Sequence, residues 1–134
     1  MKVIVDTSVW SLALRRKTKE AEQTSPQVAL LRELTQDGRA ALFGAIRQEL
    51  LSGIRTYKQY ESLRDYLRAF PDIPLEVEDY ELAANYFNTC RQQGVQGSNT
   101  DFLVCAVANR RGYTILTTDG DFELFSRHIP MDLA

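Results

Sequence analysis

The sequence predicts an α/β fold with a central, mainly parallel sheet of four to five strands flanked by helices. Short apolar runs alternate along the chain with longer segments in which apolar residues recur at helical spacing. Strands that are separated by helices form parallel sheets, because a crossover connection must bring the next strand alongside in the same direction. No internal repeat, low-complexity segment or linker divides the chain, so we expect a single domain over residues 1–134.

The first strand and the first helix follow each other directly. Residues 2–5 form a short apolar run that predicts a buried strand, and Asp6 stands where this run ends. Thr7 then opens a segment with helical spacing of apolar residues. In α/β sheets, ligands bind beyond the carboxyl ends of the strands, where Asp6 would lie. An acid in this position also caps helices, and that role alone would explain Asp6 taken by itself.

The later elements are marked by residues that start or stop helices. Ser25 and Pro26 are typical of a helix start, Asp79 is expected to cap a further helix, and Gly38 and Gly112 are typical of helix ends. We expect strands over residues 2–5, 40–43, 75–77, 113–117 and 129–131, and helices that begin near residues 7, 26, 44, 57, 79 and 101.

Composition excludes several kinds of chemistry. His128 is the single histidine, and Cys90 and Cys105 fall on apolar helical faces, where we interpret them as small buried hydrophobic residues. Zinc sites and Ser/His or Cys/His nucleophilic sites are therefore excluded, so any catalysis must depend on carboxylates, with or without a metal. The net charge of −2 excludes indiscriminate coating of nucleic acid but allows an enzyme with clustered basic residues.

The chain carries no sign of export or membrane insertion, so we expect a cytoplasmic protein. The apolar run at its start is only four residues long and is followed by an acid, unlike a signal peptide. The longest later run, residues 102–108, is too short to span a bilayer. Because these residues are apolar on all sides, they predict a helix packed inside the fold.

Acidic residues stand at several points where the predicted elements meet. Asp6 and Asp119 each follow a strand, Asp101 lies in the first turn of the buried helix, and Glu49 lies on a helix that also follows a strand. If the two strands are neighbours, these carboxylates converge and repel one another unless a hard cation lies between them. Mg²⁺ or Mn²⁺ suits such an oxygen-only set, which indicates chemistry on phosphate groups.

Four short motifs together resemble the PIN-domain nucleases, and the length and the T-x-D-x-D-F ending resemble the VapC toxins of toxin–antitoxin pairs. The resemblance covers the whole chain with the motifs in the expected order. They are Val5-Asp6-Thr7-Ser8, Gln48-Glu49-Leu50 with Gly53, Asp101 before the apolar run 102–108, and Leu116-Thr117-Thr118-Asp119-Gly120-Asp121-Phe122.

The resemblance implies a three-layer PIN-like fold and an acidic site that hydrolyses RNA phosphodiester bonds with a metal-activated water. Asp6 and Asp101 would be direct ligands of Mg²⁺, with Mn²⁺ as an alternative, and Asp119 would complete the coordination directly or through water. Glu49 would orient the attacking water. Two matched positions are small and polar, Ser8 and Thr117, and Asp121 matches a more variable acid beside the site.

The resemblance also implies partners. We expect an RNA substrate with folded structure, such as a transfer RNA, a cognate antitoxin protein and a homodimer. A homodimer is also suggested by Val9, Trp10, Leu12 and the tyrosine-rich helices, which offer more apolar surface than one small sheet can cover. Candidates for phosphate contacts are Arg15, Arg16, Lys17, Lys19, Arg47 and Arg55, although each is also explained as an ordinary surface charge.

Two other kinds of function are alternatives to a nuclease. Receiver domains and haloacid-dehalogenase-like phosphatases also place acids at strand ends, but they need a lysine near the last strands, and none follows Lys58. The phosphatase also needs a second acid two residues after Asp6, where Ser8 stands. A non-catalytic PIN-like module that only binds protein partners is the alternative to an enzyme, and it predicts that some of the four acids are missing.

Overall fold

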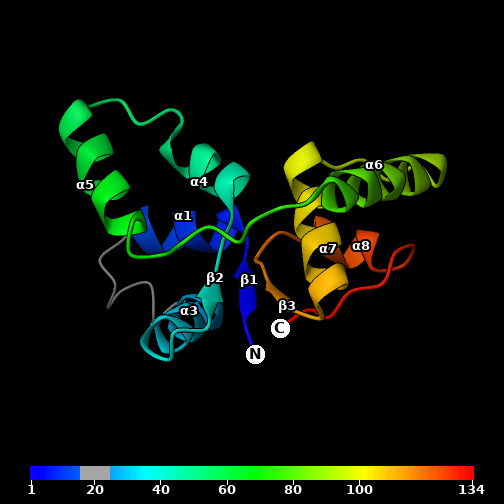
Figure 1. Ribbon diagram of the computed structural model, residues 1–134, viewed down its shortest axis with the longest axis horizontal. Coiled ribbons are helices and arrows are strands. Elements are labelled where there is room, and N and C mark those ends of the chain that lie inside the picture. Colours follow the sequence, from blue (N-terminus) through cyan, green and yellow to red (C-terminus); the bar gives the residue numbers. More distant parts are fainter. Residues whose placement is uncertain (16–24) are drawn as a thin grey trace.

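A computed structural model describes residues 1–15 and 25–134 and shows a parallel sheet flanked by helices (Figure 1). The described residues form three strands in the order β2–β1–β3, with β1 (Val3–Val5) between β2 (Ala40–Ala41) and β3 (Thr114–Leu116). Both pairings are parallel, with Val3 opposite Ala40 and Val5 opposite Leu116. The predicted α/β class is therefore confirmed, and the strand before Asp119 is a neighbour of the first strand, which is the condition under which Asp6 and Asp119 were expected to converge.

The helices lie in two groups on either side of the sheet (Figure 1). The first group is α1 (Thr7–Arg15), α3 (Pro26–Gln36), α4 (Gly44–Leu51) and α5 (Tyr57–Leu67). The second is α6 (Val77–Gln92), α7 (Asn99–Arg111) and the short α8 (Asp121–Phe125). None of the helices in the described ranges is long and apolar enough to cross a bilayer.

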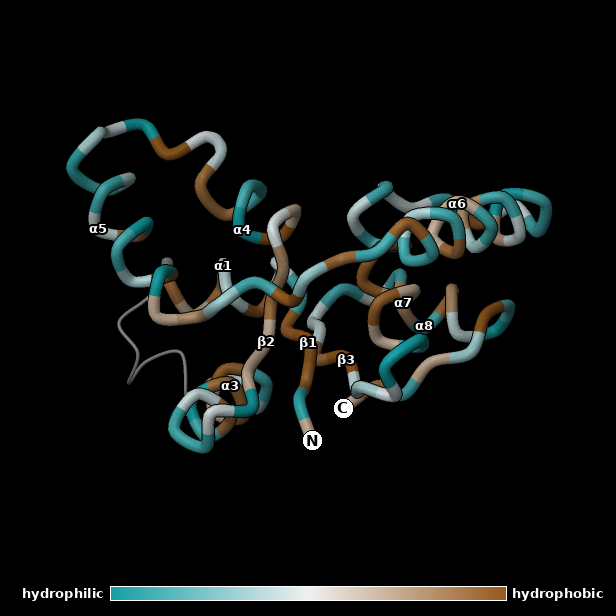
Figure 2. The backbone as a smooth tube through the Cα atoms, in the orientation of Figure 1, coloured by the Kyte–Doolittle hydropathy of each residue, from teal (hydrophilic) through white to brown (hydrophobic). Residues whose placement is uncertain are grey.

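The core lies between the sheet and these helices, and hydrophobic residues follow the strands into it (Figure 2). All residues of the apolar run 102–108 are buried, as predicted for a helix inside the fold. Cys90 and Cys105 are buried free thiols, and burial raises the pKa of both.

Val9 and Trp10 are fully buried within the single chain, so the expectation that they offer a surface to a second copy is wrong. The Trp10 ring packs edge-on against Phe70, and its Nε1 donates to the carbonyl of Val5 at 3.0 Å.

Two of the predicted strands are absent from the described residues, which hold three strands instead of four to five. The segment 75–77 is not a strand: Pro71 and Pro74 precede it, and α6 begins at Val77. The segment 129–131 is not a strand either, because Pro130 has no N–H to donate. The pairing with β3 instead occurs two residues later, where Ile115 forms an isolated parallel bridge with Leu133.

The ends of the helices confirm most of the predicted caps and correct one. Ser25 accepts a hydrogen bond from the N–H of Val28 at the start of α3, and Gly112 ends α7 in the left-handed conformation, with φ of 69°. Asp79 is not the N-cap of α6. Since this helix begins earlier than predicted, Glu76 is the cap and Asp79 lies in the first turn, accepting from the N–H of Glu76 at 2.7 Å.

Candidate functional site

Asp6 lies at the carboxyl end of the central strand, where the ladder between β1 and β3 ends. Its N–H donates to the carbonyl of Leu116 at 2.9 Å, and its side chain is almost completely buried. Asp6 Oδ2 accepts hydrogen bonds from Ser8 Oγ at 2.7 Å and from Thr117 Oγ1 at 2.9 Å. The weaker bond from the N–H of Ser8, at 3.4 Å, ends on the same oxygen. The carboxylate is therefore held in one orientation from two different elements.

Ser8 and Thr117 join the start of α1 to the segment that follows β3. Their hydroxyl oxygens lie 3.3 Å apart, and Ser8 Oγ accepts from the N–H of Thr118 at 3.1 Å. Thr117 Oγ1 in turn accepts from the N–H of Asp119 at 3.0 Å. The two small polar residues that the motifs singled out thus connect Asp6 to the backbone that carries Asp119.

Asp101 lies in the first turn of α7 and has the perturbed titration expected of an acid near other acids. Its Oδ2 accepts from the N–H of Ser98 at 3.0 Å, and its own N–H donates to Ser98 Oγ at 3.1 Å, so the two form a capping box. Burial raises the pKa of Asp101, and the negative charges of Asp6 and Asp119 raise it further, against the hydrogen bonds from Ser98. Asp101 therefore lies close enough to Asp6 and Asp119 for their charges to affect its pKa.

Asp119 lies between β3 and α8. Its Oδ1 accepts from the N–H of Asp121 at 2.9 Å. Asp121 itself is exposed at the start of α8, so its link to the acidic neighbourhood runs through its backbone N–H.

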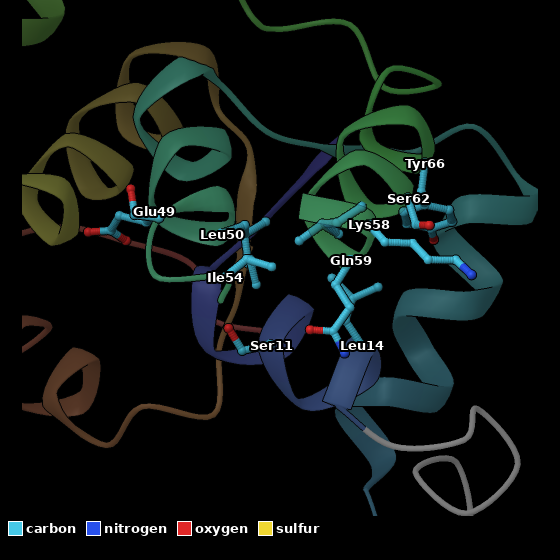
Figure 3. Close-up of a pocket in the computed structure, with 11 residues that line it drawn as sticks. Ser11, Leu14, Glu49, Leu50, Ile54, Lys58, Gln59, Ser62 and Tyr66 are labelled. Atoms are coloured by element: carbon cyan, nitrogen blue, oxygen red, sulfur yellow. The ribbon is translucent and has the colours of Figure 1, made fainter. Parts of the chain in front are cut away.

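Glu49 approaches from α4 and is held by a residue that sequence reasoning did not assign to the site. Thr7 Oγ1 donates to Glu49 Oε1 at 2.8 Å, although 42 positions separate them in sequence. Glu49 is exposed and also lies at the rim of a cleft between α1, α4 and α5 (Figure 3). The cleft has a volume of about 830 Å³ and is lined by residues that include Leu14, Lys58 and Tyr66. The position of Thr7 directly after Asp6 was the one sequence signal that could have indicated its role.

The four acids share one pattern of hydrogen bonding. In each, the hydrogen bonds from other described residues end on a single carboxylate oxygen: Oδ2 of Asp6, Oδ2 of Asp101, Oδ1 of Asp119 and Oε1 of Glu49. Within the described part of the chain, no Lys or Arg forms an ion pair with any of them. Each acid is therefore oriented through one of its two carboxylate oxygens.

The donor chemistry of this group fits a hard divalent cation. Its ligating atoms are carboxylate oxygens with hydroxyl oxygens behind them, which suits Mg²⁺ or Mn²⁺. Within residues 1–15 and 25–134, no three His, Cys, Asp or Glu side chains are gathered closely enough to hold one ion between them. That spacing is compatible with Mg²⁺, because this ion keeps several of its waters and takes only one or two carboxylates directly.

Of the basic residues expected to contact phosphate, one is engaged elsewhere, one is exposed, and the side chains of the others are not described. Arg47 is not available for phosphate: it pairs with Asp72 at 2.9 Å and donates to the carbonyls of Leu67 and Phe70. Arg55 is exposed in the loop after α4. The side chain of Arg15, together with Arg16, Lys17 and Lys19, lies outside the described residues.

Comparisons with known proteins agree with this architecture. The family model of the PIN domain matches residues 3–127. A VapC ribonuclease of Mycobacterium bovis is 27% identical over 128 residues, which cover 93% of this chain and 92% of the relative. Among solved structures, VapBC2 of Rickettsia felis bound to a promoter DNA fragment has a TM-score of 0.74 at 19% identity, covering all of this chain and 98% of that one. VapBC-1 of nontypeable Haemophilus influenzae has a TM-score of 0.73 at 14% identity, covering all of this chain and 97% of that one. The likeness to these structures shows the fold, and the family match over almost the whole length shows that the chain belongs to the PIN-domain family.

Proposed function

We propose that this protein is a divalent-metal-dependent endoribonuclease and the toxin of a toxin–antitoxin pair. The observation that supports the proposal is the chain of hydrogen bonds from Asp6 through Thr117 to the backbone of Asp119, together with the action of both charges on Asp101. The names of the relatives support the reaction, since the similar curated proteins are VapC ribonucleases. Several of the similar solved structures are VapBC assemblies, and one of these is described as a member of a family of toxin–antitoxin systems, which supports the biological role.

In this proposal Asp6, Asp101 and Asp119 hold the metal, either directly or through water. Mg²⁺ is the expected ion, with Mn²⁺ as an alternative. When bound, the ion would lower the pKa of a coordinated water and offset negative charge on the phosphate. Burial raises the pKa of Asp101, and the charges of Asp6 and Asp119 raise it further; a cation would offset this repulsion, which favours metal binding.

The remaining residues orient the reactants. Glu49, held by Thr7, would accept a hydrogen bond from the attacking water and align it with the phosphorus atom. Ser8 and Thr117 keep Asp6 in a fixed rotamer, because both hydroxyls donate to the same oxygen. Asp121 supports Asp119 through its N–H and has no assigned part in the chemistry.

The substrate is expected to be folded RNA, such as a transfer RNA, met in the cytoplasm. A protein of net charge −2 with an acidic site repels a phosphate backbone, so generic RNA binding should be weak and steeply dependent on salt. Selectivity must then come from RNA shape and from unpaired bases that can enter the site. Mapping the RNA ends produced from total RNA tests this: a few cuts in loops of structured RNA are expected, and uniform degradation of single strands would contradict it.

A cognate antitoxin and a second copy of the chain are the expected protein partners. The antitoxin would place a basic side chain among the four acids. For the homodimer, the exposed apolar residues of α6, Val77 at 67% and Tyr80 at 56%, replace Val9 and Trp10 as candidate contacts. Sedimentation that shows only a monomer at micromolar concentration would count against the homodimer.

The alternative function is a non-catalytic PIN-like module that acts through protein partners. It predicts the loss of one or more acids, whereas Asp6, Glu49, Asp101 and Asp119 are all present at the matched positions of the sequence. We therefore favour the enzyme.

The decisive experiment compares the parent with Asp6→Asn in the presence of Mg²⁺. This substitution keeps the shape of the side chain but removes a charge from the metal site, so RNA cleavage and Mg²⁺ binding should both be lost while the fold remains. Asp132→Asn is the matched control, because Asp132 is exposed near the C-terminus and its carboxylate is not assigned to the site. Cleavage by Asp6→Asn at the rate of the parent would show that the site is assigned wrongly.

A further inference from the structure

Gly97 is packed against an aromatic ring so closely that no side chain fits there. A methyl group at Gly97 would lie 2.5 Å from Cζ of Phe125 and 3.0 Å from Cε2 of Phe102. Gly97 does not belong to the glycines with positive φ, so its backbone conformation is one that any residue can adopt. Position 97 therefore requires glycine because a side chain would have no space there, and not because of its backbone conformation.

The ring of Phe125 cannot move away to make room. Phe125 is fully buried, and its ring centroid lies 4.7 Å from that of Phe102 and 5.3 Å from that of Phe122. A close-packed interior resists such a shift. Gly97 itself lines a small cavity of about 260 Å³, together with residues that include Phe87, Arg91 and Val95. An added methyl group would therefore displace the backbone of Gly97 toward this cavity rather than displace the ring.

A displacement of Gly97 would reach the acidic site within a few residues. Ser98 follows Gly97 directly, and its N–H and hydroxyl form the capping box with Asp101. The aromatic rings also connect to the second acid, because Phe122 lies in α8 and its N–H bonds to the carbonyl of Asp119 at 3.3 Å. The segments that carry Asp101 and Asp119 are therefore connected to the same cluster of rings, Phe102, Phe122 and Phe125.

We propose that Gly97 is a positioning residue: its bare Cα against Phe125 fixes where Ser98 holds the carboxylate of Asp101 relative to Asp119. The inference rests on the proposed function for its consequence in catalysis, but its structural part concerns this chain alone. A side chain at position 97 moves Asp101 out of place, and removal of the ring of Phe125 makes room for that side chain.

The test uses Gly97→Ala, Phe125→Leu and the double variant, with Gly120→Ala as the matched control. Gly120 is the residue after Asp119, has a helical φ of −62°, and has open space where a methyl group would stand. The first measurement is amide hydrogen exchange at Ser98 and Asp101 without metal, at a temperature where every variant is folded. Protection at these two amides should fall in Gly97→Ala and return in the double variant, whereas Gly120→Ala should match the parent.

The second measurement is Mg²⁺ affinity by calorimetry. We expect a loss of about 10- to 100-fold in Gly97→Ala and recovery in the double variant. Unchanged protection at Ser98 and Asp101 would overturn the inference, as would changed protection with unchanged Mg²⁺ affinity, which is what a merely structural role produces. If the parent itself binds no Mg²⁺, the proposed function fails, and the exchange measurement alone decides whether Gly97 positions Asp101.

Discussion

Thr7 and Glu49, 42 positions apart in sequence, are joined by a hydrogen bond of 2.8 Å from the threonine hydroxyl to the carboxylate. Thr7 is the first residue of α1 and directly follows Asp6, while Glu49 lies near the end of α4. The bond therefore couples the residue proposed to orient water to the strand end that carries the proposed metal ligand.

Replacing Thr7 by Val should slow RNA cleavage by up to about tenfold, because the isosteric side chain cannot donate to Glu49. The loss should fall mainly on kcat, since Glu49 is proposed to orient water rather than to bind RNA. Thr7→Ser keeps the hydroxyl and should retain most of the activity. Equal kcat values for Thr7→Val and the parent would show that the bond has no part in the reaction.

Removing the charge of Asp101 should stabilise the metal-free protein at neutral pH. Because the folded pKa of Asp101 is raised, its ionisation costs stability, and this cost grows as pH rises from the unfolded pKa, near 4, to the folded pKa. Asp101→Asn should therefore melt at a higher temperature than the parent at pH 7 and at the same temperature at pH 3, with a chelator present. The exposed Asp65 provides the control, since Asp65→Asn should show no such gain at pH 7.

Asp79 should contribute to stability with the opposite dependence on pH. It is fully buried, and hydrogen bonds from Arg111, at 2.8 and 3.0 Å, and from Arg110 hold its pKa well below the usual range. The contribution is complete above about pH 5 and is lost as pH falls below the unfolded pKa, near 4. Asp79→Asn should cost about 2–3 kcal/mol at pH 7 in urea unfolding and should flatten the loss of stability in acid. The exposed Glu78, 3.9 Å from Arg110, is the control, because Glu78→Gln should change the unfolding free energy by less than about 0.5 kcal/mol.

Substitutions of Arg47 and Arg55 should have different effects: the first should lower stability, and the second should weaken RNA binding. Arg47→Met removes the bonds to Asp72 and to the carbonyls at the end of α5, so it should cost about 2–3 kcal/mol of stability and leave the salt dependence of RNA binding unchanged. Arg55→Met, at an exposed position, should leave stability unchanged and reduce the slope of log affinity against log salt by about 1 if this residue contacts a phosphate. Comparable slopes for Arg55→Met and the parent would remove Arg55 from the list of phosphate contacts.

The sequence alone determined the features that depend on neighbouring residues. The cap at Ser25 and the end of α7 at Gly112 follow from interactions within one helical turn. The burial of residues 102–108 follows from a run that is apolar on every side of the helix, and all three features are present in the structure. The sequence also indicated that Asp6 and Asp119 would share one edge of the sheet if the strands before them were neighbours, and these strands do pair in parallel.

Only the tertiary structure decided which distant groups share a hydrogen bond or a packing contact. Nothing local in the sequence separates Arg47, held by the end of α5, from the exposed Arg55, and nothing local shows that Thr7 reaches Glu49. The short run 75–77 could not be assigned by its composition, because a few apolar residues pack equally well as a strand or as a covered loop. The close contact of Gly97 with Phe125 likewise depends on how α8 packs against the start of α7, and that is set by the shape of the whole core.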